Sequence, residues 1–514
     1  MFAGTLVNPS IAGAQSTTTP IKHLVVIFQE NVSFDHYFGT YPNATNPAGE
    51  PRFIAKPGTP GVNGYTNGLL FNNPNALNSM NGTGASGPFR LDRSEASTMD
   101  QDHDYMPEQQ AFDNGLMDLF PKFTGVAGPP PNGQPTNGLV MGYFDGNTVT
   151  AYWNYAQRFA MSDNSYDTNF GPSTDGALNL VSGQLNGVGE QQAASGSVIS
   201  DGSGGFTLVS DADPLGDKCS TTTGAALTMT GTNVGELLSA AGVTWGFFEG
   251  GFDLTATNAN GTTGCSRSTT STVTNTNKAD YIPHHEPFQY YAATANLAHT
   301  RPTSPATVGM NGDPANHQYD THDFFDAVKA GNFPAVSYLK APGFQDGHAG
   351  YSDPLDEQTF VTTVINFLQQ QPDWSSTAVV IAYDDSDGWY DHQMGPIVNQ
   401  STSPLDALTG PNQCGTGTNA LAGVTAEHAQ GRCGYGPRLP LLVISPFSKK
   451  NYVDHTVTDQ SSILRFVEDN WLGSQRIPGS FDTLAGRINT MFDFKNPDTT
   501  PLILNTTTGL VTQY

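Results

Sequence analysis

Two apolar runs of the sequence end in residues that carry carboxylate or amide oxygens. The runs span residues 23–28 and 378–383, and the side chains that follow them are Glu30, Asn31, Asp384 and Asp385. Hard divalent cations prefer such oxygen ligands. If both runs are strands near the centre of one sheet, the four side chains converge and could hold a metal ion. The alternative is that the first pair caps a helix and that the two aspartates form a turn.

A serine that could act as a nucleophile follows a Gly-Pro turn. Ser173 comes directly after Gly171 and Pro172 and precedes residues that are compatible with a helix. The free N–H groups and the dipole at a helix N-terminus favour an anion such as phosphate. Beside a metal ion, a serine in this position could be activated for attack. A simple helix cap is the alternative role.

Histidines in loops are the third chemical element, since they can bind phosphate and donate protons. Twelve histidines are present. The four in the most suggestive surroundings are His103, His284, His285 and His348. For each one alone, a structural or surface role is the alternative. The sequence contains no G-x-S-x-G elbow and no Walker loop.

Alternating helices and apolar strands surround these residues. The predicted strands are residues 23–28, 243–248, 334–339, 378–383 and 439–444. The predicted helices are residues 233–241, 322–330, 360–368 and 463–471. This alternation is typical of an α/β fold, with a mostly parallel sheet and helices on both faces. Ligands in such folds bind beyond the carboxyl ends of the strands.

Long segments rich in Gly, Asn, Thr and Pro interrupt this pattern. We predict that they are insertions in a single domain, residues 21–514, and not linkers between domains. The segments lie near residues 40–100, 186–230, 252–280 and 401–437.

The charge of the chain limits its partners. The 514 residues carry a formal net charge of −26. Nucleic acid is excluded as a partner, because phosphate backbones are bound by clustered Lys and Arg. Docking on anionic lipid is disfavoured, although a neutral headgroup could enter a pocket. No apolar run is long enough for a transmembrane helix.

The cysteines and the N-terminus indicate an oxidising compartment. None of the four cysteines has the spacing of a zinc site, and each lies in a polar, loop-like stretch. The local pairs Cys219–Cys265 and Cys414–Cys433 are the expected disulfides, with four free thiols as the alternative. Residues 1–20 have the character of a residual secretory signal. We therefore expect a secreted or periplasmic protein.

Seven stretches, in order, resemble the bacterial phosphoesterase family that contains phospholipases C and a class of acid phosphatases. They are HLVVIFQENVSFDHYFGTYP, DHDYMPEQQAFDNGLMDLF, NFGPSTDGALNLVSGQ, YIPHHEPFQYY, DGHAGYSDPLDEQTFVTTVIN, AVVIAYDDSDGWYDH and GYGPRLPLLVISPFS. They run from about residue 20 to about residue 475. The resemblance implies an alkaline-phosphatase-like α/β core, with one metal ion beside a hydroxyl nucleophile.

The resemblance also assigns roles to the residues singled out above. It implies that Ser173 is the nucleophile and also contacts the metal, with Thr174 as the alternative. Glu30, Asn31, Asp384 and Asp385 match the two metal-binding pairs, and His103, His284, His285 and His348 match the histidines around the phosphoryl group. The oxygen-rich ligands are compatible with Ca²⁺, Mg²⁺ or Mn²⁺, and the nearby histidines leave Zn²⁺ open.

The stretch around the nucleophile favours one branch of this family. Phospholipases C resemble a GPT-x-PNR pattern there, whereas this chain has GPSTDGALNLVSGQ. We therefore expect a secreted acid phosphatase that hydrolyses small phosphate monoesters through a phosphoserine. An acidic optimum is expected because imidazoles are charged mainly below about pH 6.5.

Two alternatives remain open. One is a phospholipase C acting on phosphatidylcholine or a relative, with choline held by aromatic residues. Candidates for that role are Tyr290, Tyr291, Trp389 and Tyr390. The other is a metal-binding surface protein without turnover.

Overall fold

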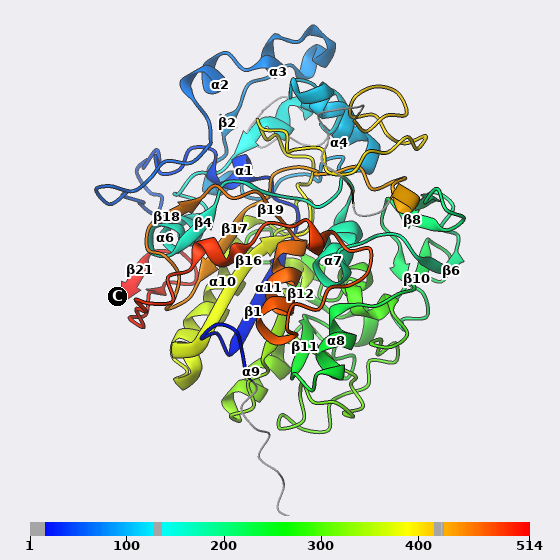
Figure 1. The fold of residues 1–514 in the computed structure, drawn as a ribbon. Helices are drawn as coiled ribbons and strands as arrows, with labels where there is room; N and C mark the ends of the chain where they lie inside the picture. Colours follow the sequence, from blue (N-terminus) through cyan, green and yellow to red (C-terminus); the bar gives the residue numbers. More distant parts are fainter. Residues whose placement is uncertain (1–15, 127–135, 416–422, 424–425, 514) are drawn as a thin grey trace, which may run out of the picture.

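The computed structural model describes residues 16–126, 136–415, 423 and 426–513 (Figure 1). Residues 1–15 lie outside this part, and with them most of the predicted secretory segment. So do residues 416–422 and 424–425 of the predicted insertion at 401–437.

The centre of the molecule is an eight-stranded sheet. Its order is β14 (Gln318–Asp320), β11 (Trp245–Glu249), β15 (Val336–Lys340), β1 (His23–Gln29), β16 (Thr377–Tyr383), β17 (Leu441–Ile444), β4 (Ala160–Ser162) and β18 (Tyr452–Asp454). Within the described sheet, β17 alone runs antiparallel to its neighbours. The predicted α/β fold with a mostly parallel sheet is confirmed. The sequence did not predict β14, β4 and β18, which have only three residues each.

The central strand β1 is buried on both faces, as its continuous apolar run predicts. Val25 and Ile27 pack into one core cluster, whereas Leu24, Val26 and Phe28 pack into a second. The alternation follows from the two-residue period of a strand, which sends successive side chains to opposite faces.

Helices cover each face of the sheet (Figure 1). One core cluster includes residues of α6 (Thr150–Arg158), α9 (Thr321–Lys329) and α10 (Pro354–Gln369). The other includes residues of α7 (Ser173–Ser182), α8 (Val234–Ala240) and α11 (Ser461–Trp471). The predicted two-sided arrangement is therefore present. Among the described helices, none combines the length and the apolar character needed to cross a membrane.

The predicted insertions form small structures around this core. Residues 186–230 contain a second sheet of β6 (Val188–Gln192), β10 (Ala226–Met229) and β9 (Asp213–Pro214). A disulfide joins Cys219 to Cys265 and another joins Cys414 to Cys433, as predicted.

The first insertion forms one end of the molecule. It contains α2 (Asn67–Phe71), α3 (Pro74–Leu77), a 3-10 helix η1 (Ser79–Gly84) and β2 (Phe89–Arg90). In the view of Figure 1, α2 and α3 lie at the top, and α1 (Phe34–Phe38) lies between them and the sheet. Since α1 follows β1 directly, the insertion lies on the side of the sheet where β1 ends.

Candidate active site

The carboxyl ends of β1 and β16 meet and bring the two predicted oxygen-bearing pairs together. The strands pair in parallel from His23 and Thr377 to Gln29 and Tyr383, so the residues that follow them emerge side by side. The backbone N–H of Asn31 donates a hydrogen bond to Asp384 Oδ1 at 2.9 Å. All four predicted side chains, Glu30, Asn31, Asp384 and Asp385, are buried.

Two residues at this edge adopt a left-handed backbone conformation that non-glycine residues rarely use. Asn31 has φ 60° and Asp387 has φ 54°. Asn and Asp tolerate this region best, and such conformations concentrate at functional sites. The Asn31 amide also donates to Asp387 Oδ1 at 3.3 Å. The strained backbone therefore points the Asn31 side chain into the acidic cluster.

Helix α7 presents Ser173 to this cluster. Ser173 is the first residue of the helix, as predicted from the Gly-Pro turn. The helix lies so close to the end of β16 that a Cβ at Gly176 would fall 2.0 Å from the carbonyl oxygen of Asp384. Glycine at position 176 is thus required for the approach that places the hydroxyl at the site.

The Ser173 hydroxyl faces three acceptor oxygens. Its Oγ lies 2.9 Å from Glu30 Oε2, 3.0 Å from Asp385 Oδ2 and 3.4 Å from Asn31 Oδ1. A hydroxyl has one proton to donate, so it cannot satisfy all three oxygens. Asp384 Oδ2 is buried without a hydrogen-bond partner among the described residues. These oxygens form a donor set that fits a hard divalent cation.

Thr174, the alternative nucleophile, faces a different residue. Its hydroxyl donates to Asp211 Oδ1 at 2.8 Å, and its backbone N–H donates to the same oxygen at 3.0 Å. The geometry therefore favours Ser173 for any reaction at the acidic cluster.

Lys340, which the sequence analysis missed, is the counter-charge of the cluster. It ends β15, the other neighbour of β1. Its ammonium forms an ion pair with Glu30 Oε1 and lies 3.7 Å from Asp384 Oδ2. The available signal was the same strand-end rule that identified Glu30, because the predicted strand 334–339 is followed at once by this lysine.

Burial makes negative charge costly in the cluster. It raises the pKa of Asp385 to about 8, with a further contribution from the neighbouring Asp384 carboxylate. Burial also raises the pKa of Glu30, against the opposing effect of the Lys340 ammonium. Carboxylates in this situation gain from a proton or a bound cation.

Two of the predicted histidines contact the cluster directly. His103 Nδ1 lies 2.8 Å from the carbonyl oxygen of Gln101. Its other ring nitrogen, Nε2, lies 3.4 Å from the Asn31 amide nitrogen and 4.0 Å from Asp385 Oδ2. His285 Nε2 lies 3.4 Å from Glu30 Oε2. Both rings thus border the space in front of Ser173.

The other two predicted histidines lie one residue further out. The His284 ring contacts that of His285, and its nitrogens lie 3.6 Å from Asp213 Oδ1 and 4.0 Å from Asp211 Oδ2. The ring of His348 lies 6.0 Å from that of His103, between centroids. The structure therefore places all four histidines around the site, but at two distances from it.

The four imidazoles differ in charge, contrary to the uniform behaviour on which the expected acidic optimum was based. Burial lowers the pKa of His348 to about 4 and holds the pKa of His285 well below its usual value. Burial opposes charge on His284 as well, but Asp211 and Asp213 outweigh it and raise the pKa of His284 to about 9. Burial is outweighed at His103 too, where Asp385, Asp387 and Asp100 hold the pKa well above the usual range.

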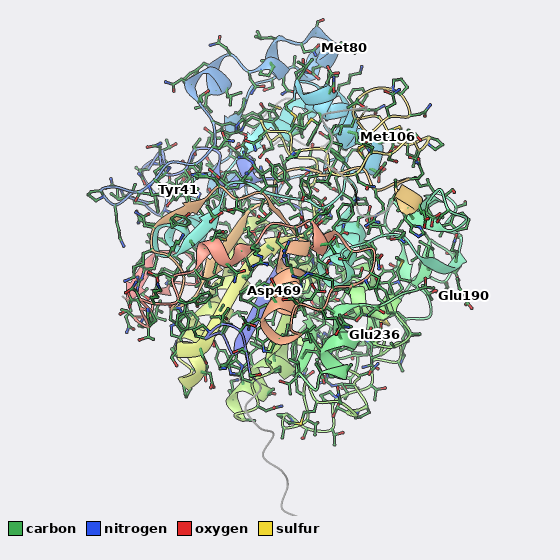
Figure 2. All side chains as sticks on the ribbon, viewed as in Figure 1. Tyr41, Met80, Met106, Glu190, Glu236 and Asp469 are labelled. Carbon is green, nitrogen blue, oxygen red and sulfur yellow. A yellow bond between two sulfur atoms is a disulfide. The ribbon has the colours of Figure 1, made fainter. Side chains whose placement is uncertain are left out.

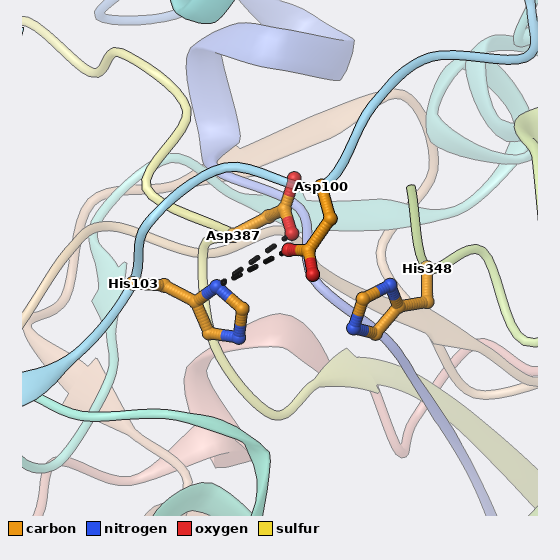
Figure 3. Close-up of side chains that lie close together, drawn as sticks. All are labelled: Asp100, His103, His348 and Asp387. Carbon is orange, nitrogen blue, oxygen red and sulfur yellow. Dashed lines mark ion pairs between the residues drawn. The ribbon is translucent and has the colours of Figure 1, made fainter. Parts of the chain in front are cut away.

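Figure 3 shows a second group with metal-ligand character, which contacts the acidic cluster through His103 and Asp387. Asp100, His103, His348 and Asp387 each offer one ligand atom, and these atoms lie within 4.8 Å of one another. His103 Nδ1 lies 3.6 Å from Asp100 Oδ1 and 3.7 Å from Asp387 Oδ1. Sequence analysis missed both aspartates, although Asp387 follows the predicted pair by two residues. The site thus offers two neighbouring places for a cation.

The four aromatic residues considered for a choline-binding box do not form one. All are buried, and they are divided among three core clusters. Trp389 stacks on His36 with ring centroids 4.0 Å apart. Tyr290 donates its hydroxyl proton to the Ala212 carbonyl. The Tyr390 hydroxyl accepts a hydrogen bond from the Asn73 amide. Tyr291 packs in the same cluster as Tyr290. Their aromatic character serves packing.

Comparison with known proteins places this site in a family. Residues 21–472 match the model of the Phosphoesterase family. The chain belongs to the Phosphoesterase family. This membership confirms the resemblance seen in the sequence.

The curated relatives that the chain matches include bacterial phospholipases C. The chain is 26% identical over 503 residues to the non-hemolytic phospholipase C of Pseudomonas aeruginosa. The match covers 94% of this chain and 58% of the Pseudomonas protein. The chain is 25% identical over 497 residues to phospholipase C A of Mycobacterium tuberculosis, covering 93% of this chain and 78% of that protein. The chain thus spans little more than half the length of the Pseudomonas relative.

Among solved structures, the chain is similar to a protein in the alkaline phosphatase superfamily from Vibrio parahaemolyticus. That similarity covers 86% of this chain and 90% of the other, with 10% identity and a TM-score of 0.28. Murine ectonucleotide pyrophosphatase / phosphodiesterase 5 matches 67% of this chain at 10% identity, with a TM-score of 0.31.

Proposed function

We propose that this protein is a phosphodiesterase of the phospholipase C type, which cleaves phosphatidylcholine or a related phospholipid with Ser173 as nucleophile. Family membership over residues 21–472 and the phospholipase C relatives support the reaction class. The observation that carries the proposal is the position of the buried Ser173 hydroxyl, 2.9 Å from Glu30 and 3.0 Å from Asp385. The proposal favours the diester over the monoester expected from the sequence.

In the proposed reaction, Ser173 Oγ attacks phosphorus and its proton passes to one of the two carboxylates that it contacts. The bond from phosphorus to the diacylglycerol oxygen breaks, and that oxygen takes a proton from His103 Nε2. The result is diacylglycerol and a phosphoserine that carries the choline headgroup. Water then cleaves the phosphoserine and releases phosphocholine.

His103 is the proposed proton donor because of its position. Its Nδ1 is held by the Gln101 carbonyl, which directs Nε2 toward Asn31 and Asp385. His348 lies behind it, and its Nδ1 contacts the Ala349 carbonyl. His285 lies beside Glu30 and would contact the phosphoryl oxygens, and the ring of His284 packs against it.

We further propose that one divalent ion is held by Glu30, Asn31, Ser173, Asp384 and Asp385. The unsatisfied oxygens around Ser173 support this ligand set. When bound there, such an ion lowers the pKa of the serine hydroxyl and offsets the charge of the phosphoryl group. Ca²⁺, Mg²⁺, Mn²⁺ and Zn²⁺ remain the candidates.

Hydrolysis of phosphate monoesters is the second candidate function. It is favoured by the stretch that begins at Gly171, where Ser replaces the Thr expected of a phospholipase C and the Asn-Arg pair is missing. The two disulfides support a place outside the cytoplasm, either secreted or periplasmic.

One comparison tests the proposal. A soluble phosphorylcholine diester and a simple phosphomonoester are each incubated with the protein from about pH 4 to about pH 9, with and without a chelator. We expect faster turnover of the diester and its loss with the chelator. Preference for the monoester would support the second candidate. If the metal-loaded protein hydrolysed neither ester, both candidate functions would be contradicted. A metal-binding surface protein without catalytic activity would then be the remaining alternative.

A further inference from the structure

The segment that lies furthest beyond the end of β1 exposes large apolar side chains. Phe71 is 78% exposed, Leu77 is 75% exposed and Met80 is 56% exposed. They belong to three consecutive short elements, α2, α3 and η1, and Figure 2 shows Met80 at the outer edge of the molecule. We call these three residues the apical patch. The three side chains fall within residues 71–80, and exposed apolar surface concentrated in one segment marks an interaction surface.

The same segment buries three of its polar side chains while it exposes these apolar ones, which reverses the usual pattern. Asn73, Asn75 and Asn81 are buried. Asn75 donates to the Met117 carbonyl at 2.8 Å and accepts from the Phe120 N–H at 3.0 Å, while Asn81 donates to the Asp118 carbonyl at 2.8 Å. Asparagines thus fix the segment to the protein below and leave its apolar side chains pointing outward. The patch is therefore held in place by specific contacts and is not a loose loop.

The charge of the segment selects the partner. Residues 57–89 contain no Asp, Glu, Lys, Arg or His, whereas the whole chain carries −26. A protein with this charge is repelled by anionic surfaces, but an uncharged apolar protrusion can enter a neutral one without losing ion hydration. A zwitterionic phospholipid bilayer meets both conditions, because it offers an apolar interior and carries no net charge.

The position of the patch relative to the site fits this partner. The Asn73 amide donates to the Tyr390 hydroxyl at 3.1 Å, and Tyr390 belongs to the loop after β16 that also carries Asp385 and Asp387. The patch and Ser173 are therefore attached to the same end of the sheet. A bilayer bound at the patch would lie on the side from which a phospholipid must reach the site.

We propose that the apical patch inserts into zwitterionic phospholipid membranes and docks the protein on them. The choice of a phospholipid surface rests on the proposed function, but the docking itself can be measured without hydrolysis. The full chain with Ser173→Ala serves for binding, since it should leave the lipid intact. Its flotation with phosphatidylcholine vesicles is compared with that of the same protein carrying Phe71→Ser, Leu77→Ser and Met80→Ser.

We expect the triple substitution to lower vesicle binding about tenfold or more. A matched control replaces three exposed apolar residues elsewhere, Phe206, Met310 and Leu484, with serine and should bind like the parent. Adding anionic lipid to the vesicles should weaken binding of the parent. Equal binding by parent and apical variant, or no binding of the parent to phosphatidylcholine, would overturn the proposal.

Two further measurements distinguish membrane docking from a role of the patch in hydrolysis or in dimer formation. With Ser173 intact, the apical substitutions should leave hydrolysis of monomeric short-chain phosphatidylcholine unchanged while hydrolysis of vesicles falls about tenfold. Failure of the unsubstituted protein to hydrolyse the monomeric lipid would contradict the proposed function, and flotation would still decide the docking. If sedimentation showed that the substitutions convert a dimer to a monomer without affecting vesicle binding, a second copy of the chain would be the partner and the proposal would be wrong.

Discussion

Ser173 Oγ lies 3.0 Å from Asp385 Oδ2, although 212 positions separate the two residues in the chain. The contact depends on the first turn of α7 lying against the end of β16, which the absence of a side chain at Gly176 permits. Neither residue is unusual within its own segment. Their chemistry arises only when the sheet places β16 beside β1, so that Glu30 reaches the same hydroxyl from the other strand.

Ser173→Ala tests the nucleophile. Because the Ser173 hydroxyl donates to oxygens of the acidic cluster, we expect a folded protein whose diester hydrolysis falls by about four orders of magnitude or more. Thr174→Val is the matched control, since its hydroxyl faces Asp211, and it should lower turnover less than about tenfold. Initial rates and thermal melting of both variants are the measurements. The reverse ranking would make Thr174 the nucleophile.

The fold was largely predictable because its central strands are long apolar runs. Five predicted strands and four predicted helices are present, and each ends near the predicted residue. The strands β14, β4 and β18 were missed because three residues are too few to show a periodic pattern. Their pairing depends on neighbours that are distant in the sequence.

The site was predictable where a residue follows a recognisable strand or turn. Glu30, Asn31, Asp384, Asp385 and Ser173 all meet this condition. Asp100 lies in a loop with no such landmark, and its place beside His103 is fixed only by the tertiary fold. The buried state of Trp389 was likewise invisible, because an aromatic residue that packs in the core and one that binds a ligand look the same in a single sequence.

Metal content distinguishes the two candidate cation sites. We expect about one divalent ion per chain, lost on Asp385→Asn and retained on Asp387→Asn, because Asp385 contacts Ser173 whereas Asp387 belongs to the neighbouring group. Elemental analysis after gel filtration gives the stoichiometry. Loss of the ion on Asp387→Asn alone would place it between His103 and His348. Two ions in the unsubstituted protein would mean that both places are used.

Lys340→Met tests the counter-charge of the cluster. Without the ammonium, the buried carboxylates of Glu30 and Asp384 lose their positively charged neighbour. The free energy of unfolding of chelator-treated protein should therefore fall by about 3 to 5 kcal/mol. Adding a divalent metal should restore more stability to this variant than to the unsubstituted protein, since the ion replaces the missing positive charge. Urea unfolding with and without metal measures both effects.

The control for this variant is Lys329→Met, at an exposed lysine on α9. It makes the same chemical change at the surface, where the ammonium lies 3.8 Å from the exposed Asp326, and should alter the free energy of unfolding by less than about 0.5 kcal/mol. If both variants lost the same small amount, Lys340 would have no special relation to the acidic cluster.

The pH dependence of stability reports on Glu357, which lies behind the site on α10. Tyr37 and Tyr383 each donate to its carboxylate at 2.7 Å. Burial nevertheless raises the pKa of Glu357 from 4.5 to about 7, because the tyrosine hydrogen bonds offset only part of its effect. Between these values the folded protein holds a proton that the unfolded chain releases. The free energy of unfolding should therefore fall as pH rises through this window, by about 3 kcal/mol from this group.

Glu357→Gln removes this titration while keeping the side-chain size. We expect the variant to match the unsubstituted protein at about pH 4.5 and to exceed its free energy of unfolding by about 2 to 3 kcal/mol above about pH 7. Comparing the two proteins by urea unfolding at each pH isolates Glu357, because the other buried carboxylates titrate in both. Glu190→Gln makes the same chemical change at an exposed residue of β6 and provides the control. A difference at Glu357 that is independent of pH would show that this carboxyl group keeps an ordinary pKa in the folded protein.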